Sequence, residues 1–179
     1  MMFRAIFSKK INKGYQQAVV LMLFTCSLLG MSVTRADEGM TDHIGALEQG
    51  QLLEDFPKFA DNYTEYQPSS SELAAVEKLN RAIAAGTKLS MDVYLGTWCH
   101  DSQREVPKLL KLYANSNVVI NMVGLDRQKT DPQNLAKQAG VEFTPTIIVK
   151  VNEHVLGRII ERPQQSLAED IWAIYQASL

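Results

Sequence analysis

Met91-Asp92-Val93-Tyr94-Leu95-Gly96-Thr97-Trp98-Cys99-His100-Asp101-Ser102 joins a predicted β-strand to a predicted helix. Its first half is a mostly apolar run typical of a strand, which stops at Gly96-Thr97, and helical periodicity begins after the cysteine. Cys99 is therefore expected at the start of a helix. The unpaired backbone N–H groups and the dipole of a helix N-terminus favour a thiolate, so this position predicts a reactive cysteine.

Hydrophobic periodicity on both sides of this sequence predicts further helices and strands. Ser71 and Glu72 begin an amphipathic helix with Leu73, Val76, Leu79 and Ile83 on its apolar face, and Gly86 would close it. The other expected elements are a strand over 89–95, a helix over 99–113 kinked by Pro107, a strand over 118–123, a short helix over 131–139, a hairpin of strands over 147–151 and 155–160, and a helix over 167–177 capped by Ser166. This order implies an α/β fold whose central mixed β-sheet is flanked by helices on both faces.

Residues 37–70 form an N-terminal extension with weaker patterns. Ala46–Phe59 has faint helical periodicity that Pro57 would end, and an extended connector is expected to follow. Tyr63 and Tyr66 in this extension are expected to make core or edge contacts rather than to bind a ligand. The sequence thus divides into a leading segment (1–36), the extension (37–70) and a folded domain (71–179).

The leading segment has the pattern of a cleavable signal peptide. A basic stretch from Arg4 to Lys13 precedes the apolar run Ala18–Val33, and Thr34-Arg35-Ala36 places small residues where a signal peptidase cuts. An uncleaved membrane anchor is the alternative, although the run is short for a membrane span. Lipidation at Cys26 is disfavoured because the residues before it fit a lipoprotein box poorly. Cleavage after residue 36 would place the mature protein outside the cytoplasm, with the periplasm as the expected compartment.

Export would leave the mature chain with one thiol. Cys26 would leave with the signal peptide, so Cys99 could not form an internal disulfide. Cys99 is then either buried and inert or able to react with an external partner. A lone cysteine in an exported protein favours the second alternative.

The charge distribution argues against nucleic-acid binding. The whole chain has a formal net charge of -2, but residues 1–36 contain five basic residues and no acid. The remainder therefore carries thirteen basic and twenty acidic residues, a net charge of -7. A nucleic-acid-binding domain needs a basic face, which this composition does not supply.

The order of elements and the Trp98-Cys99-His100-Asp101-Ser102 motif resemble the thioredoxin-like superfamily over residues 71–179, as an exported monothiol (CxxS) member. Pro107 lies where thioredoxins kink the active-site helix. Thr144-Pro145-Thr146 lies where the family has its cis-proline loop, and a hairpin containing Gly157 and a terminal helix follow. The resemblance implies the thioredoxin-like fold with an N-terminal extension.

The resemblance also implies roles for single residues. Cys99 would be the nucleophile that attacks a disulfide and forms a mixed disulfide. The Thr144–Pro145 bond would be cis, so that the backbone of Thr144 pairs with an extended peptide substrate, and Trp98 would form the rim of the site. Asp126 falls near the place where thioredoxins have an acid that accepts a hydrogen bond from a tryptophan indole; the alternative for Asp126 is a solvated loop.

Ser102 departs from the family pattern, because it occupies the place of the second, resolving cysteine. A mixed disulfide on Cys99 would then need an external thiol, such as glutathione or another protein, to release it. The Ser102 hydroxyl could still donate a hydrogen bond to the Cys99 thiolate.

The acid that dithiol thioredoxins bury six residues before the first cysteine is also missing, since that position holds Val93. Asp92 is offset by one residue, which turns it to the opposite face of the strand, so a solvated strand-end charge is expected there. Within the motif, a protonated His100 would favour a thiolate and Asp101 would oppose it.

Two hypotheses of function follow from these residues. The first is monothiol thiol–disulfide exchange outside the cytoplasm, with protein or glutathione disulfides and thiols as partners. The second is a non-catalytic peptide-binding or partner-binding module in which Cys99 is a relic or a crosslink. Neither hypothesis requires a cofactor, and the three histidines have no spacing that predicts a metal site.

Overall fold

The computed structural model describes residues 41–83 and 87–179. All of them belong to one compact unit. The predicted signal peptide over 1–36 and the predicted closing glycine Gly86 lie outside the described residues. Within the described part of the chain, no helix is long and apolar enough to span a membrane.

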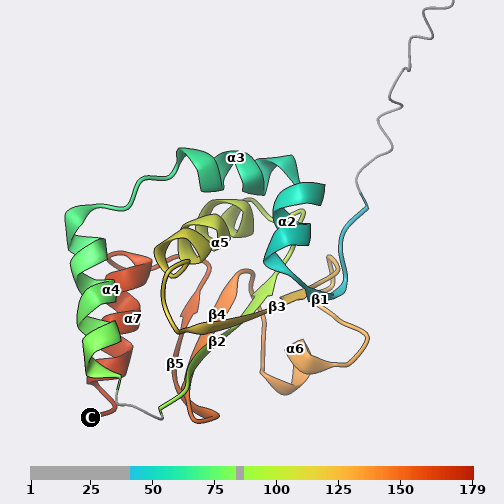
Figure 1. Ribbon diagram of the computed structural model, residues 1–179. Coiled ribbons are helices and arrows are strands. Elements are labelled where there is room, and N and C mark those ends of the chain that lie inside the picture. Colours follow the sequence, from blue (N-terminus) through green and yellow to red (C-terminus); the bar gives the residue numbers. More distant parts are fainter. Residues whose placement is uncertain (1–40, 84–86) are drawn as a thin grey trace, which may run out of the picture. The chain divides into compact units, whose positions relative to one another are not determined.

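A mixed five-stranded sheet forms the centre of this unit, as the sequence predicts (Figure 1). Its strands lie in the order β1-β3-β2-β4-β5. Strands β2 and β3 are parallel, and the other three neighbouring pairs are antiparallel. The strand bounds are β1 Gly45–Leu47, β2 Leu89–Leu95, β3 Val119–Gly124, β4 Thr146–Val151 and β5 His154–Ile160.

Strand β2 is the central strand, and its successive side chains point alternately into two hydrophobic cores, one on each face of the sheet. Met91, Val93 and Leu95 are fully buried in the larger core, while Tyr94 belongs to a smaller core on the other face. Because successive strand residues point to opposite faces, Asp92 lies on the same face as Tyr94, opposite Met91 and Val93. Strand β2 ends at the loop that contains Trp98 and Cys99.

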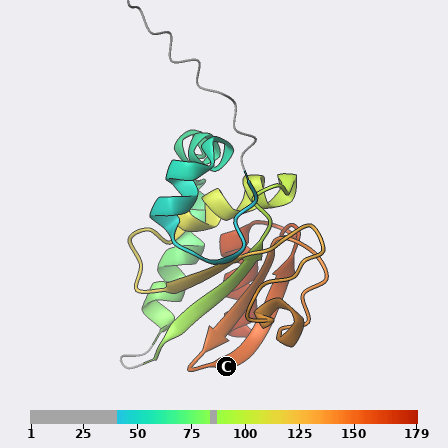
Figure 2. The ribbon, with the colours of Figure 1, turned by 90° about the vertical axis from the view of Figure 1, so that its right-hand side faces the viewer.

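Helices cover both faces of the sheet, but unequally (Figure 2). The larger core contains buried residues from α2, α3, α4, α5 and α7, whereas the smaller core receives a helical residue from α6, Ala136. The fold class predicted from the sequence is confirmed, with most of the helical cover on one side. The helix bounds are α2 Gln49–Asp55, α3 Pro57–Glu65, α4 Ser70–Ala82, α5 His100–Leu112, α6 Leu135–Gln138 and α7 Leu167–Gln176.

The N-terminal extension differs from the expected helical turn and connector. Ala46 lies in β1, which pairs with β3. Helix α2 ends just before Pro57, as expected, but Pro57 also begins a second helix, α3, where a connector was expected. Proline suits the first turn of a helix because the N–H it lacks has no helical partner there. Tyr63 and Tyr66 pack against the larger core, as expected. The residues from β1 onward are therefore part of the same compact unit, and residue 71 is not a structural boundary.

Helix α4 begins earlier than the sequence suggests. Ser69, not Ser71, is the N-cap, and it forms a capping box with Glu72. Leu73, expected on the apolar face, is 53% exposed, whereas Val76 and Leu79 are buried. The N-cap could not be assigned from the sequence, because residues 69, 70 and 71 are all serines and each could begin the helix.

The short helix expected over 131–139 is reduced to the single turn of α6. The carboxylate of Asp131 accepts hydrogen bonds from the backbone N–H groups of Gln133, Leu135 and Ala136, and Asn134 has a left-handed conformation (φ 57°). A carboxylate that binds nearby N–H groups competes with helix formation. The expected hairpin of β4 and β5 and the Ser166 cap of α7 are present.

Candidate active site

Cys99 is the N-cap residue of α5, a helix of 13 residues. Its N–H donates to the carbonyl of Gly96 (3.0 Å), and its own carbonyl accepts from the N–H of Gln103 (2.9 Å). The thiol is half-buried and forms no disulfide within residues 41–83 and 87–179. Cys99 therefore lies at the N-terminus of α5, as expected, although its side chain forms no capping hydrogen bond with the helix.

The loop before β4 lies directly against this thiol. The Cys99 Sγ donates to the carbonyl oxygen of Thr144 at 3.2 Å, across 45 residues of sequence. The Thr144–Pro145 peptide bond is cis. The carbonyl of Pro145 accepts from the N–H of Glu161 (2.8 Å), which joins this loop to the end of β5. The structure therefore brings together Cys99, Thr144 and Pro145, the three residues that the sequence resemblance grouped.

Trp98 is held over the end of β2. Its indole N–H donates to the carbonyl of Leu125 (3.1 Å), and the guanidinium of Arg127 lies 5.4 Å from the ring centre. A Cβ on Gly96 would lie 2.6 Å from the ring, so the loop needs glycine there. The tryptophan side chain is thus held by a hydrogen bond at its indole N–H and by the guanidinium of Arg127 over its ring.

Ser102 does not make the contact expected of it. Its side chain is fully buried, and its Oγ accepts a hydrogen bond from the N–H of Gly96 (3.2 Å). No hydrogen bond joins Ser102 to Cys99 in the described part of the chain; the Cys99 thiol instead faces Thr144. Ser102 therefore stabilises the loop in front of α5.

The charged pair of the motif has unequal surroundings. His100 is exposed, whereas Asp101 forms an ion pair with Arg104 (2.6 Å) and lies 3.9 Å from Arg162. A cation this close offsets the negative charge of Asp101. The carboxylate of Asp101 is thus paired with a cation within its own helix.

The predicted contact between Asp126 and the tryptophan indole is wrong, and the solvated-loop alternative describes Asp126. The indole of Trp98 donates to the carbonyl of the preceding residue, Leu125. The Asp126 carboxylate instead accepts from the hydroxyl (2.6 Å) and the N–H (2.7 Å) of Thr130, and these hydrogen bonds lower its pKa. The residue is partly exposed, as a loop-closing carboxylate can be.

Asp92 lies on the face of β2 opposite Val93, as its position predicts. It is not a solvated strand-end charge, however. Its carboxylate pairs with Lys150 of the adjacent strand (2.7 Å) and accepts from the side-chain amide of Asn121 (2.8 Å). The hydrogen bond to Asp92 raises the pKa of Lys150. Asp92 is thus a cross-strand partner on the far face, and β2 supplies no acid from position 93 to the cysteine.

Several residues that support the site were not found from the sequence. The N–H of His43 donates to the buried hydroxyl of Thr97 (3.2 Å), and Asp42 pairs with Arg127 (3.5 Å). The side chain of Gln103 donates to the carbonyl of Thr97 (2.9 Å). The contacts of His43 and Asp42 attach the segment before β1 to the active-site loop and to the loop after β3. These two contacts join distant parts of the chain, and no local motif indicates them.

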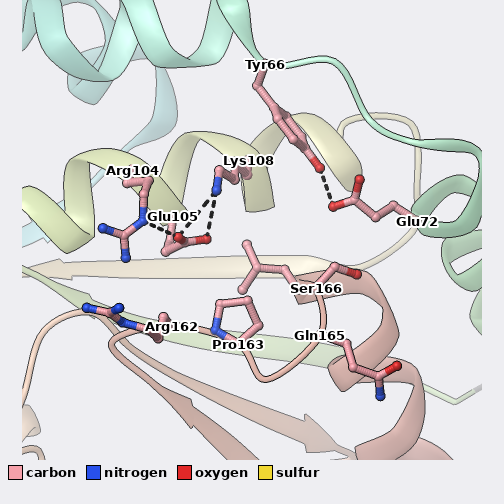
Figure 3. Close-up of a pocket in the computed structure, with 10 residues that line it drawn as sticks. Tyr66, Glu72, Arg104, Glu105, Lys108, Arg162, Pro163, Gln165 and Ser166 are labelled. Atoms are coloured by element: carbon pink, nitrogen blue, oxygen red, sulfur yellow. Dashed lines mark hydrogen bonds and ion pairs between the residues drawn. The ribbon is translucent and has the colours of Figure 1, made fainter.

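A polar pocket of about 310 Å³ lies between α5, the start of α4 and the loop from β5 to α7 (Figure 3). Arg104, Glu105 and Lys108 line it from α5, Tyr66 and Glu72 from the segment around the α4 start, and Arg162 from the loop. Within residues 41–83 and 87–179, no three His, Cys, Asp or Glu side chains are grouped so that they could hold a metal ion.

The order of the strands, the half-buried cysteine at the start of α5 and the cis-proline loop opposite it are those of the thioredoxin-like fold that the sequence resemblance implies. Solved structures that align with this chain include a protein of unknown function from Pseudomonas aeruginosa. It is 18% identical, the alignment covers 74% of this chain and 99% of that one, and the TM-score is 0.44.

Thioredoxin f from spinach chloroplast is 22% identical, with 62% of this chain and 98% of that chain covered and a TM-score of 0.40. The germline-specific thioredoxin Deadhead from Drosophila melanogaster is 21% identical, with 57% and 91% covered and a TM-score of 0.34. No protein-family model and no curated protein matches the sequence.

Proposed function

We propose that this protein carries out monothiol thiol–disulfide exchange, with Cys99 as the nucleophile. The observation that carries the proposal is the half-buried Cys99 thiol at the N-terminus of α5, 3.2 Å from the backbone of Thr144 beside Pro145. A helix N-terminus favours the thiolate, which is the form of cysteine that attacks a disulfide.

The proposed reaction is an exchange without net oxidation. The Cys99 thiolate attacks one sulfur of a substrate disulfide, a new bond forms between Cys99 and that sulfur, and the other sulfur leaves as a thiolate. An external thiolate then attacks the substrate sulfur of the mixed disulfide. This step regenerates the Cys99 thiolate and leaves the substrate joined to the external thiol.

The external thiol is needed because Ser102 stands where a second cysteine would resolve the mixed disulfide. Ser102 is fully buried and bonded to the N–H of Gly96, so it supports the loop and has no part in the exchange. Glutathione or a cysteine of another protein is the proposed resolving thiol. The substrate is a protein or glutathione disulfide whose chain lies along Thr144 and Pro145, with Trp98 at the rim.

We further propose that the exchange takes place after export, in the periplasm. The basic and apolar pattern of residues 1–36 supports this location, and cleavage after Ala36 would leave every described helix and strand intact. Disulfides form and persist in that compartment, which would supply the substrates.

The test measures exchange between the full-length chain and a glutathionylated peptide, with reduced glutathione as the resolving thiol. Cys26→Ala is present in all samples so that Cys99 is the only thiol, and Cys99→Ser in the same background is the matched control. We expect exchange faster than the uncatalysed reaction for the first variant and the uncatalysed rate for the second.

Equal rates for the two variants would contradict the exchange proposal. If the Cys99→Ser variant still bound the peptide under those conditions, the alternative of a non-catalytic binding module would be favoured. Peptide binding is measured separately by fluorescence anisotropy with a non-disulfide analogue.

A further inference from the structure

The pocket between α5 and the loop from β5 to α7, here called the α5–α7 pocket, is built around a buried carboxylate (Figure 3). Only 4% of Glu105 is exposed. Its carboxylate accepts from the guanidinium of Arg104 (2.5 Å) and from the ammonium of Lys108 (3.3 and 3.4 Å). Glu105 therefore holds two cationic side chains at the wall of the pocket.

The cations of the pocket outnumber its available anions. Arg104, Lys108 and Arg162 line it, against Glu105 and Glu72. The Glu72 carboxylate is already engaged, because it accepts from the hydroxyl of Tyr66 (2.6 Å) and from the N–H of Ser69 (2.8 Å). The lining thus has one more positive than negative side chain, and Asp101, which pairs with Arg104 outside the lining, offsets that difference.

Two of the three cations are loosely held. Charge-assisted N–H···O bonds are about 2.7–2.9 Å long. The ammonium of Lys108 is at least 3.3 Å from Glu105, and the guanidinium of Arg162 is 3.9 Å from Asp101 and 71% exposed. Both groups therefore keep donors that a further anion could use, whereas Arg104 is held tightly by Asp101 and Glu105.

The pocket borders the site of the proposed exchange. The N–H of Glu161 donates to the carbonyl of Pro145 (2.8 Å), and Arg162 is the next residue. The guanidinium of Arg162 then approaches Asp101, in the first turn of the helix that Cys99 caps. A substrate chain joined to Cys99 and lying along Pro145 would pass beside Arg162 at the mouth of the pocket.

We propose that the α5–α7 pocket binds a carboxylate of the disulfide substrate, with Lys108 and Arg162 as its ligands. This inference rests on the proposed exchange function and adds a specificity site to it. A carboxylate accepts hydrogen bonds from both an ammonium and a guanidinium, and Glu105 and Asp101 keep the two cations in place without saturating them. A substrate with a neutral amide at the same place would lose this attraction.

The test compares two mixed-disulfide peptides that differ only by glutamate or glutamine near the reacting cysteine. We expect the glutamate peptide to have a KM lower by about fivefold, as for one partly exposed ion pair, and the advantage to shrink with added salt. In Lys108→Gln and Arg162→Gln the ratio of the two KM values should fall towards one. Lys137→Gln, an exposed cation on α6 over the other face of the sheet, is the matched control and should keep the ratio.

Each outcome has a distinct meaning. Equal KM values for the two peptides in the unmodified protein, or a ratio unchanged by Lys108→Gln and Arg162→Gln, would overturn the carboxylate site while exchange itself is still measured. Absence of exchange with both peptides would refute the proposed function, and the carboxylate site with it. A parallel pair, glutathione disulfide and its glycyl ethyl ester, shows whether the carboxylate belongs to glutathione or to a peptide side chain.

Discussion

Ser102 is the residue that separates this site from a dithiol site. It lies three residues after Cys99, on the same side of α5, and its hydroxyl accepts from the N–H of Gly96 at the end of β2. A sulfur atom at this position would meet Cys99 across one turn of helix. In the proposed exchange, the difference between needing an external thiol and resolving a mixed disulfide internally thus depends on one atom.

Replacing Ser102 by cysteine should convert the site into an internal dithiol. In the Ser102→Cys variant we expect a disulfide between residues 99 and 102 under oxidising conditions, because Cys99 caps α5 and residue 102 lies in its first turn. Mixed disulfides with a substrate peptide should then be released without added glutathione. Non-reducing gels and mass spectrometry of the adduct over time measure this release.

Ser90→Cys is the matched control for that variant. Ser90 is similarly buried, but it lies in β2 and its hydroxyl has no hydrogen-bond partner among the residues that the structure describes. The control should form the same adduct on Cys99 and retain it until an external thiol is added. If the Ser102→Cys variant also retained its adduct, then residue 102 would not be in reach of the mixed disulfide.

Sequence motifs predicted the centre of the site better than its surroundings. Cys99, Thr144 and Pro145 were grouped by their order and spacing, and the structure places them together. Of the two alternatives for Asp126, the contact with the indole was wrong, because the carbonyl of Leu125 accepts that hydrogen bond. The stacking of Arg127 on Trp98 depends on loops that approach only in the folded chain, so no local pattern could indicate it.

At the scale of elements, the capping box of α4 links a helix start to the α5–α7 pocket. Glu72 accepts from the hydroxyls of Tyr66 and Ser69 as well as from the N–H of Ser69. Burial alone would raise the pKa of Glu72, but these hydrogen bonds outweigh it and lower the pKa. The same carboxylate thus fixes the start of α4 and forms one wall of the pocket.

Glu72→Gln should destabilise the protein in a pH-dependent way. A carboxylate with a lowered pKa contributes stability above its ordinary pKa, and this contribution is lost as the pH falls through the lowered value. We expect a loss of about 1 kcal/mol in the free energy of unfolding at pH 7, and a smaller difference from the unmodified protein below about pH 4. Urea denaturation at both pH values measures it.

Glu77→Gln controls for a change of charge on the same helix. Glu77 pairs with Arg81 in an exposed i,i+4 ion pair, which contributes about 0.3–0.5 kcal/mol at most. The Glu77→Gln variant should therefore lose little free energy of unfolding at either pH. A Glu72→Gln penalty that did not depend on pH would show that the charge of Glu72 has no part in the cap.

Helices and strands with a long periodic pattern could be predicted from the sequence. Those that are very short, or whose length depends on a single contact, could not. The apolar run of β2 and the amphipathic pattern of α7 extend over many residues, so their type could be predicted. β1 has three residues, too few for a pattern, and its pairing with β3 joins distant sequence. The length of α6 depends on which N–H groups the carboxylate of Asp131 binds.

At the scale of the whole molecule, β1 and the segment before it connect the edge of the sheet to the active-site loop. β1 pairs with β3 and brings Leu47 into the larger core. A Cβ on Gly124 would collide with the backbone of His43, so the two segments pack closely, and the N–H of His43 reaches Thr97. The N-terminal extension therefore covers a strand edge and supports the loop that carries Cys99.

Removing β1 should consequently affect both stability and solubility. We compare a chain that begins at Thr41 with one that begins at Glu48, which lacks β1 and its contacts. The shorter chain loses the burial of Leu47 and the hydrogen bonds to β3, so its free energy of unfolding should fall by about 3 kcal/mol. It also leaves the edge of β3 unpaired, a common cause of association between chains.

Urea denaturation and light scattering distinguish these effects. The shorter chain should unfold at lower urea and scatter more light as its concentration rises. Leu47→Ala in the longer chain removes the core contact but keeps the strand, so it should lower stability without promoting association. If the shorter chain unfolded at the same urea concentration as the longer one, then β1 would be dispensable, and residues 48–179 alone would form the stable unit.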